Sequence, residues 1–277
     1  MVEAVAARLK KVVERPDRLK IAALTRFAQL TNRTIEIKVR LFTGQAMLVM
    51  LPDTASTILA YEGDYEPEVT EMMRLMLKPG DTFFDVGAHI GTRSMVACSL
   101  GAGKVAAFEP APDNLRVLGR NCAGLYQVQI VDKAVSDISR LTVSMQIFET
   151  RYCGSNTLEE KPRLPESLAR NYAKGSVPVK TVTLDDYVAS TGMVPDLVKL
   201  DVEGHTDRVL RGARATLKAH RPAVIAEVGG YGSEAKEDLE VLMCLGYGFW
   251  VWGTGGGLTR DELETNNERN VLAVWKG

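Results

Sequence analysis

The stretch FFDVGAHIG, residues 83–91, places an acidic residue near the end of an apolar run and then two glycines four positions apart. An apolar run that leads through a glycine turn into an amphipathic segment is typical of a strand–turn–helix unit in an α/β sheet. Such a turn usually binds phosphate groups at the start of its helix. The carboxylate beside this turn therefore raises the question of which ligand would fit instead.

From about residue 80 onward, short apolar runs alternate with amphipathic stretches, which predicts βαβ units on a mostly parallel sheet. We expect five strands in this pattern, followed by a terminal antiparallel pair; the expected strands are 82–86, 104–110, 128–135, 196–202, 222–228, 247–252 and 270–275. The expected helices are 91–100, a helix opened by Pro110 and Pro112 and ending at Asn121, 206–220, and about 233–244.

Three regions do not follow this alternation of strands and helices. Residues 1–79 are expected to form an N-terminal extension with a hairpin (35–42 and 46–51) and a helix (68–78), so that the main domain is 80–277. Residues 136–195 make a long excursion between the third and fourth strands, and connections of this length usually serve as lids or binding loops. Residues 253–270 form a polar, glycine-rich connection before the last strand.

Composition excludes several classes of protein. The net charge of −1 gives no reason to expect a nucleic-acid partner, and no apolar run approaches the ~20 residues of a membrane span. The four cysteines show no CxxC spacing, so a metal cluster or redox pair is not indicated and a reducing cytoplasm fits best. The basic segment before residue 20 has apolar residues at helical spacing; we expect a helix packed on its own domain, with a membrane-surface helix or an oligomer contact as alternatives.

The glycine pattern decides between ligands. A dinucleotide site requires G-x-G-x-x-G, and here Gly87 and Gly91 enclose Ala-His-Ile without the middle glycine. Asp85 would repel a phosphate and attract an ammonium or sulfonium group. Glu109, 22 positions after Gly87, stands where βαβ sites bind a ribose diol. S-adenosylmethionine combines a cationic amino acid and a ribose without phosphate. A nicotinamide-dependent oxidoreductase shares the turn and the downstream acid, and a purely structural turn is the further alternative.

Six segments also carry a family resemblance. In chain order they are FFDVGAHIG, KVAAFEPAPDNLRVLGRN, KAVSD, TLDDY, DLVKLDVEGH and RPAVIAEV. Over roughly residues 62–230 the chain resembles the FkbM-type S-adenosylmethionine-dependent methyltransferases. This resemblance implies a class I methyltransferase (Rossmann-like) doubly wound sheet of order 3-2-1-4-5-7-6, mostly parallel with an antiparallel last strand. It also implies O-methylation, mostly of hydroxyls on sugars or natural-product scaffolds. The chain departs from the family at His89, where Asn is usual, and at Thr206, where Glu is frequent.

The segment KLDVEGH, residues 199–205, supplies the candidates for chemistry. Period-two alternation puts Lys199, Asp201 and Glu203 on one face, and His205 falls near the start of the next helix. A hydroxyl acceptor gains from a base that removes its proton, so we expect catalytic roles for Glu203, His205 and Asp201. Three plainer interpretations stay open: Lys199 neutralises a neighbouring acid, Asp201 anchors the cofactor's amino acid, and His205 caps a helix.

The cofactor side is expected to involve a larger set of residues: Asp85, Gly87, His89, Gly91, Glu109, Ala134, Asp201 and Glu66. Ala134 follows the third strand, where class I enzymes bracket adenine. Glu66, beside Tyr65, matches a family position that could close over the cofactor. Asp185 and Asp186 are expected to cap the helix DDYVAS. No further acid-rich motif adjoins strand 196–202, so we expect no metal.

The sequence thus predicts a cytoplasmic enzyme that methylates a hydroxyl of a small molecule or glycan. The alternative from another functional class is a binding module that has the methyltransferase fold but no catalytic activity. Both the identity of the acceptor and the oligomeric state stay open.

Overall fold

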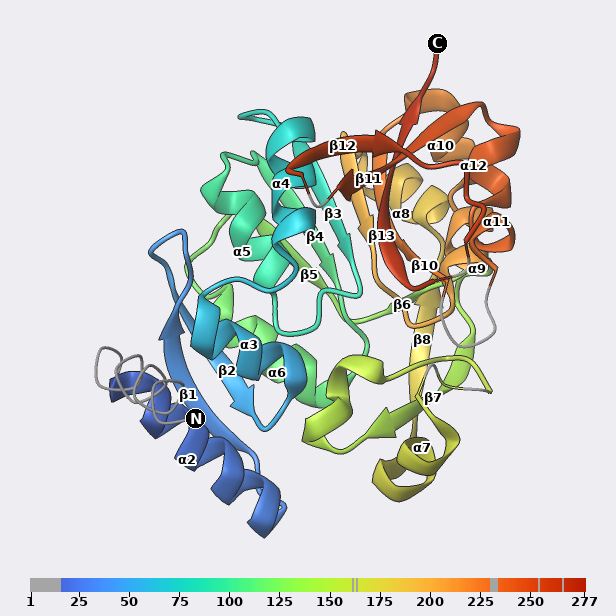
Figure 1. Ribbon diagram of the computed structural model, residues 1–277. Helices are drawn as coiled ribbons and strands as arrows, with labels where there is room; N and C mark the ends of the chain where they lie inside the picture. The colour runs from blue at the N-terminus through green and yellow to red at the C-terminus, as the bar shows by residue number, and fades with distance from the viewer. Residues whose placement is uncertain (1–15, 161, 163, 230–233, 254, 266) are drawn as a thin grey trace. The chain divides into compact units, whose positions relative to one another are not determined.

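The computed structural model describes residues 16–160, 162, 164–229, 234–253, 255–265 and 267–277 (Figure 1). Its contacts divide the chain into two units. The first unit comprises the residues up to Tyr65 together with Thr150–Gly154; the second comprises Glu66–Glu149 and Ser155–Gly277. Helix α4 (Pro67–Met76) contacts strands of the second unit. The domain limits drawn from the sequence, and the lid role of 136–195, stay predictions.

The first unit is built on a hairpin and two helices. Strand β1 (Ile35–Arg40) pairs antiparallel with β2 (Ala46–Leu51), which confirms the expected hairpin. Every residue of β2 after the first is buried, and the strand contacts α2 (Pro16–Thr31) and α3 (Thr54–Glu62). Asp53 caps α3 because its carboxylate accepts the Ser56 backbone N–H at 2.8 Å. Most of the basic N-terminal segment, through residue 15, lies outside the described residues.

The second unit contains an eight-stranded sheet of order β12-β11-β13-β10-β9-β3-β4-β5. The strands are β3 (Thr82–Val86), β4 (Lys104–Phe108), β5 (Val128–Val131), β9 (Leu197–Leu200), β10 (Ala223–Val228), β11 (Tyr247–Gly253), β12 (Gly257–Arg260) and β13 (Arg269–Trp275). Without β12 this order is 3-2-1-4-5-7-6, and β13 runs antiparallel to both of its neighbours. The doubly wound sheet and its antiparallel last strand are therefore confirmed.

Strand β12 corrects one expectation. We took 253–270 as a connection, but residues 257–260 pair antiparallel with β11 and add an edge strand. The pattern hid this strand because three of its four residues are exposed, so no apolar face marks it.

Both faces of the sheet are covered, which explains why its central strands read as continuous apolar runs. Phe83 and its neighbour Phe84 are both fully buried, on opposite faces. Phe83 packs with α4 and α5 (Thr92–Ser99), whereas Phe84 packs with α8 (Leu184–Thr191), α9 (Thr206–Arg211) and α10 (Arg214–His220). The Phe84 and Tyr187 rings meet edge to face at 5.5 Å. Helix α6 (Pro112–Asn121) contributes Leu118 to a smaller cluster beside β4.

The third strand is shorter than expected. It ends at Val131, and Ala134–Val135 form β6 of a separate three-stranded sheet with β8 (Ala173–Val182) and β7 (Thr142–Phe148). The single strand predicted over 128–135 is wrong because Asp132 is exposed and interrupts the apolar run. The excursion also contains η1 (Thr150–Ser155) and α7 (Glu166–Tyr172).

Two predicted helices are each divided in two. The helix expected over 206–220 is α9 and α10, and that over 233–244 is α11 (Ala235–Asp238) and α12 (Glu240–Cys244). The Asp185 carboxylate accepts the backbone N–H groups of Ala215 and Thr216 at 3.0 and 2.7 Å, which fixes the start of α10. Asp185 therefore caps a different helix from the one expected, because Thr183 caps α8. Among the described helices, none has the length and apolar character needed to cross a membrane.

Candidate active site

The glycine turn after β3 lies against the end of β9. Gly87 has φ +83°, and a Cβ there would fall 1.8 Å from the Asp201 carbonyl oxygen. Gly91 has φ +94°, and its Cβ would lie 2.7 Å from Leu118 Cδ1. Only glycine combines a positive φ with so close an approach of two backbones. The turn therefore holds the carboxyl ends of β3 and β9 together, at the edge where open α/β sheets bind ligands.

Asp85 lies beneath this turn and is fully buried. Ser94 donates a hydrogen bond of 2.6 Å from Oγ to Asp85 Oδ2, while Asp85 Oδ1 has no hydrogen-bond partner. Burial raises the pKa of Asp85, and Lys199, opposite it in the strand register, partly opposes this rise. The turn thus stands over an acceptor atom that a donor or a cation would satisfy, which disfavours a phosphate there.

Glu109 joins the turn to the next helix. Its Oε2 accepts the His89 backbone N–H and its Oε1 accepts the Ala111 backbone N–H, both at 2.8 Å. Burial raises the pKa of Glu109 to about 7, although these hydrogen bonds oppose the rise. The Asn114 side chain also hydrogen-bonds Glu109. A carboxylate offers about four acceptor positions, so one remains for a hydroxyl group. The position at the end of β4 therefore fits a sugar hydroxyl.

A buried ionic network occupies the end of β9. Lys199 is 3% exposed and donates a short hydrogen bond to Asp201 Oδ2, which confirms that it neutralises a neighbouring acid. Burial alone would lower the pKa of Lys199, but the Asp201, Glu66 and Asp85 carboxylates hold it above its ordinary value. For Asp201, burial would raise the pKa, but the Lys199 charge together with hydrogen bonds from Lys199 and Glu227 holds it below its ordinary value. Asp201 thus remains ionised.

Arg93 fixes the position of Glu66. Its buried guanidinium donates to Thr70 Oγ1 at 2.8 Å, to the Glu66 carbonyl at 3.1 Å and to Glu66 Oε2 at 3.4 Å. Glu66 adopts a left-handed backbone conformation (φ +54°) at the start of α4. Asn270, which lies near the start of β13, donates to Glu66 Oε1 at 3.1 Å. These contacts hold the Glu66 carboxyl at a cavity rather than in solvent.

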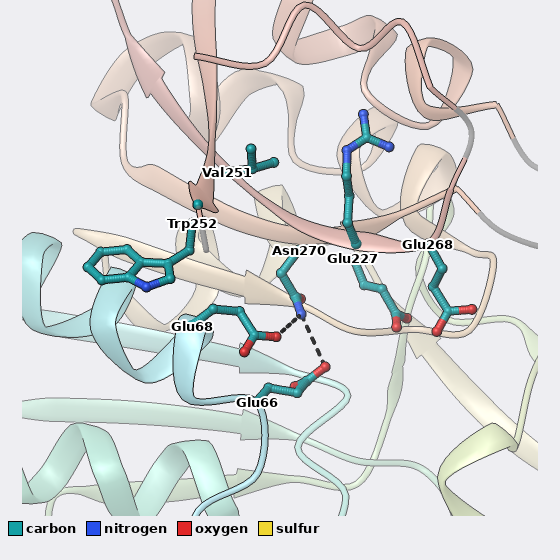
Figure 2. A pocket seen from close by; sticks show the side chains of 9 residues that line it. Glu66, Glu68, Glu227, Val251, Trp252, Glu268 and Asn270 are labelled. Carbon is teal, nitrogen blue, oxygen red and sulfur yellow. Dashed lines mark hydrogen bonds between the residues drawn. The ribbon is translucent and has the colours of Figure 1, made fainter. Parts of the chain in front are cut away.

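That cavity has a volume of about 560 Å³ and lies beside the carboxyl end of β10 (Figure 2). Its walls come from α4, β10, β11 and β13, and the lining residues are Glu66, Glu68, Glu227, Val251, Trp252, Gly253, Glu268, Arg269 and Asn270. Figure 2 shows Glu227 and Glu268 on one side of Asn270 and the pair Glu66 and Glu68 on the other. The one cation in this lining, Arg269, directs Nε to Asp261 at 2.7 Å and Nη1 to two backbone carbonyls. The cavity is thus strongly acidic, with an indole wall.

Three carboxylates converge at its inner end. One oxygen each of Asp201, Glu203 and Glu227 lies within 4.8 Å of the others. Burial raises the pKa of Glu227 well above its ordinary value, and the Asp201, Glu203, Glu268 and Glu66 charges add to the rise. We expected no metal because we saw no third acid beside β9; Glu227 supplies one, so that premise is wrong. Three carboxyl groups this close share either a cation or protons, and metal independence stays a prediction.

The corner at Glu203–His205 is held by the excursion. Glu203 has φ +49°, and its carbonyl oxygen accepts a 2.8 Å hydrogen bond from Thr157 Oγ1. His205 is buried, with Nδ1 at 2.6 Å from Glu159 Oε1 and Nε2 at 2.9 Å from Ser136 Oγ. Both ring nitrogens of His205 are thus committed to side chains of the excursion. Its side chain makes no cap to α9, although its backbone holds the cap position.

The structure brings together most of the residues singled out in the sequence. Asp85, Gly87, His89, Gly91 and Glu109 form one group around the turn, and Asp201, Glu203 and Glu66 form another near the cavity. Ala134 lies in β6, where it is paired with Thr181 of β8 and packs in a cluster with Ala111. The sequence reasoning missed four residues: Arg93, Glu159, Glu227 and Asn270. Glu227 was within reach, because it is an acid at the end of a buried strand, as are Asp85 and Glu109.

The strand order and this carboxyl-edge site define the class I methyltransferase type of fold. Residues 85–249 match the sequence family described as "Methyltransferase FkbM domain". The chain belongs to this family.

Two characterised relatives are similar in sequence. The hexuronic acid methyltransferase AglP of Haloferax volcanii is 32% identical over 154 residues, an alignment that covers 54% of this chain and 58% of AglP. The 31-O-demethyl-FK506 methyltransferase FkbM of Streptomyces tacrolimicus is 32% identical over 196 residues, with 63% of this chain and 75% of that protein covered.

Solved structures show weaker likeness. A methyltransferase FkbM from Methylobacillus flagellatus KT is 14% identical with a TM-score of 0.45, covering 96% of this chain and 60% of that one. Fibrillarin from Aeropyrum pernix, solved with bound S-adenosyl-L-methionine, is 12% identical with a TM-score of 0.45, covering 87% of this chain and 99% of that one.

Proposed function

We propose that the protein transfers a methyl group from S-adenosylmethionine to a hydroxyl of a small molecule or glycan. The observation that carries this proposal is the placement of Glu109 beside the Gly87 turn, with an acidic cavity along the same sheet edge. The two characterised relatives are named for a hexuronic acid and for a 31-O-demethyl compound, which supports acceptors of this kind. When bound, S-adenosylmethionine supplies an electrophilic methyl group.

The residues present fit such a cofactor. Asp85 Oδ1 is a buried acceptor without a partner beside the turn, and both glycines of the turn, Gly87 and Gly91, have positive φ. In this proposal Glu109 binds a ribose hydroxyl, and the 85–91 turn with His89 holds the amino-acid part. Asp201 and Glu66 face its cationic end, and the backbone at Ala134 borders the adenine. Phosphate-bearing cofactors fit less well because of Asp85.

On the acceptor side, the chain must hold a hydroxyl in line with the methyl group and remove its proton. Glu203 and Asp201 are close enough to the cavity to take part. His205 acts differently in this proposal: because both its ring nitrogens are engaged, it positions the Glu203 corner.

A nicotinamide-dependent oxidoreductase is the weaker alternative. His89, with φ +51°, stands where a dinucleotide fingerprint has its middle glycine, so a side chain occupies the position of closest pyrophosphate approach. The match to the methyltransferase family also disfavours it. We place the reaction in the cytoplasm because none of the four cysteines, all of them among the described residues, forms a disulfide or has CxxC spacing.

Calorimetry tests the proposal directly. S-adenosylmethionine and S-adenosylhomocysteine should bind, and NAD should bind far more weakly. Glu109→Ala should weaken S-adenosylhomocysteine binding by roughly 1–3 kcal/mol, because a charge-assisted hydrogen bond is lost. Thermal melts of the variant control for misfolding. Tighter binding of NAD, or unchanged affinity in Glu109→Ala, contradicts the assignment.

Transfer of a labelled methyl group then tests the reaction. The acceptor probes are the methyl glycosides of glucose, rhamnose and glucuronic acid, and mass spectrometry would identify the methylated position. Labelled ether products would support the proposal, whereas binding of S-adenosylmethionine without transfer to any hydroxylated probe would favour a binding module.

A further inference from the structure

Glu227 is the acid best placed to do chemistry in the cavity. It lies one residue before the end of β10, at the carboxyl edge of the sheet, and it lines the cavity together with Trp252 (Figure 2). We infer that Glu227 is the catalytic base that accepts the proton of the acceptor hydroxyl. This inference rests on the proposed methyl transfer and names a residue of the RPAVIAEV segment to which the sequence analysis gave no role.

The backbone of Glu227 is held from both sides. It pairs with Asn270 of β13 in the strand register, and its carbonyl oxygen accepts a 3.4 Å hydrogen bond from Thr206 Oγ1 at the start of α9. Its neighbours Ala226 and Val228 are fully buried. A side chain on a fixed strand keeps its geometry better than one on a loop, so Glu227 meets the positional demand on a proton acceptor.

The charges that face Glu227 make its carboxyl basic. Four carboxylates face it from three corners of the fold: Asp201 and Glu203 after β9, Glu66 before α4, and Glu268 before β13. Of the nearby cations, Lys199 pairs with Asp201 and Arg93 pairs with Glu66. Arg269, which also lines the cavity, pairs with Asp261 through Nε, while its Nη2 has no hydrogen-bond partner. Burial and these like charges both raise the pKa of Glu227. A carboxylate with a raised pKa holds a transferred proton more strongly than an ordinary glutamate does.

The other candidates are less suitable. Asp201 has a lowered pKa because Lys199 pairs with it, so it is a weak base. His205 presents neither ring nitrogen to the cavity, because Glu159 and Ser136 hold both. Glu203 belongs to the same carboxylate cluster as Glu227. It lies beyond the end of β9, where its backbone is left-handed, so no strand fixes its position.

The step balances in atoms and charge. The acceptor oxygen forms a bond to the methyl carbon while the carbon–sulfur bond breaks and its electron pair stays on sulfur. The hydroxyl proton passes to the Glu227 carboxylate, which becomes a neutral acid and later releases the proton to water. The products are a methyl ether and a neutral thioether, and no further reactant is required.

Infrared spectroscopy tests the state of the carboxyl without turnover. In protein saturated with S-adenosylhomocysteine, wild type should show a protonated carboxyl that titrates well above the ordinary range of Glu. This component should vanish in Glu227→Gln and persist in Glu240→Gln, an exposed acid of α12. Glu109 also has a raised pKa, so the difference between variants, not wild type alone, decides. A component that persists in Glu227→Gln overturns the inference.

Methyl transfer to the methyl glycoside that wild type accepts best gives the second readout. Glu227→Gln should lower kcat by at least ~10²-fold with S-adenosylhomocysteine affinity and KM little changed, and Glu240→Gln should match wild type. The acid limb of the kcat–pH profile should disappear in Glu227→Gln. If Glu227→Gln keeps wild-type turnover, the inference about Glu227 is overturned and the proposed function stands. The same holds if a chelator abolishes activity and Mg²⁺ restores it. Absence of cofactor binding in wild type overturns the proposed function instead.

Discussion

The acidic side chains at the two halves of the sheet's carboxyl edge have different partners. At the β3–β4 half, the chain's own backbone satisfies both oxygens of Glu109. At the β9–β10 half, Glu227 is surrounded by other carboxylates, and Lys199 forms an ion pair with Asp201. Glu109 is thus hydrogen-bonded before any ligand arrives, although Asp85 Oδ1 in the same half has no hydrogen-bond partner. The β9–β10 half holds more negative charge than its cations balance, so its protonation should change when a ligand binds.

This difference matches the two tasks of a methyltransferase. A cofactor that is always the same can be bound by a rigid turn whose hydrogen bonds are made in advance. An acceptor that must lose a proton requires a group whose charge can change during the reaction. We therefore assign cofactor recognition to the β3–β4 half and proton transfer to the β9–β10 half. The predictions below test this assignment.

The largest effect is expected at Gly87. Gly87→Ala places a Cβ 1.8 Å from the Asp201 carbonyl oxygen in a left-handed conformation, so the ends of β3 and β9 must separate. We expect a loss of more than about 4 kcal/mol in the free energy of unfolding, measured by urea denaturation, or failure to fold.

Gly119→Ala is the matched control for that variant. Gly119 lies in α6, and a Cβ added there would meet nothing within 4 Å, so alanine should stabilise the helix by up to about 1 kcal/mol. Equal stability of the two alanine variants would mean that the two halves are not joined through Gly87.

The second prediction concerns the charge of the acceptor. Four glutamates line the cavity and its one lining arginine is largely engaged, so a carboxylate-bearing acceptor should be repelled. Among matched glycosides, kcat/KM for methyl glucuronide should fall more than about 10-fold below that for methyl glucoside, and added salt should narrow the gap. Preference for the glucuronide, the class for which AglP is named, would show that this acidity does not govern acceptor choice.

Much of this arrangement could be predicted from the sequence, because buried parallel strands and the turns after them leave strong patterns. The run 82–86 and the acids Asp85 and Glu109 marked the first half of the edge, and the sheet formed as expected. Each of these features depends on residues within about 25 positions of one another, where spacing carries geometric information.

The second half could be predicted only in part. Glu227, Glu66 and Asn270 meet through a sheet that joins distant segments. The family resemblance implied that the last strand enters between β10 and β11, but no spacing in the sequence indicated which side chains meet there. The role of His205 was hidden for the same reason. Its partners Ser136 and Glu159 come from an excursion whose path the sequence does not define. Hydrogen bonds between segments that are far apart along the chain leave no periodic pattern in the sequence.

The third prediction uses the pKa of Glu109, which is about 7 instead of the usual 4.5. Hydroxyl donors bind the ionised carboxylate, so cofactor binding should release a proton, and affinity should rise with pH. We expect S-adenosylhomocysteine to bind about 10-fold more tightly at pH 8 than at pH 6, with proton release visible in calorimetry across buffers. Glu109→Gln should bind more weakly and lose most of this pH dependence. A flat profile in wild type would indicate that Glu109 does not contact the ribose.

The smaller of the two effects on stability is expected where the excursion meets the Glu203–His205 corner. Thr157→Val removes two hydrogen bonds of Thr157 Oγ1, one donated to the Glu203 carbonyl and one accepted from the Glu159 backbone N–H, but keeps the shape of the side chain. The loss in the free energy of unfolding should be about 1–3 kcal/mol, the usual net value of two hydrogen bonds. Thr142→Val, at an exposed position of β7, is the control and should stay within about 0.5 kcal/mol of wild type. If the corner serves the acceptor half, Thr157→Val should also raise KM for the acceptor while leaving S-adenosylhomocysteine affinity unchanged. A variant that weakens cofactor binding instead would show that the Glu203 corner belongs to the recognition half, and the division between the two halves would have to be redrawn through β9.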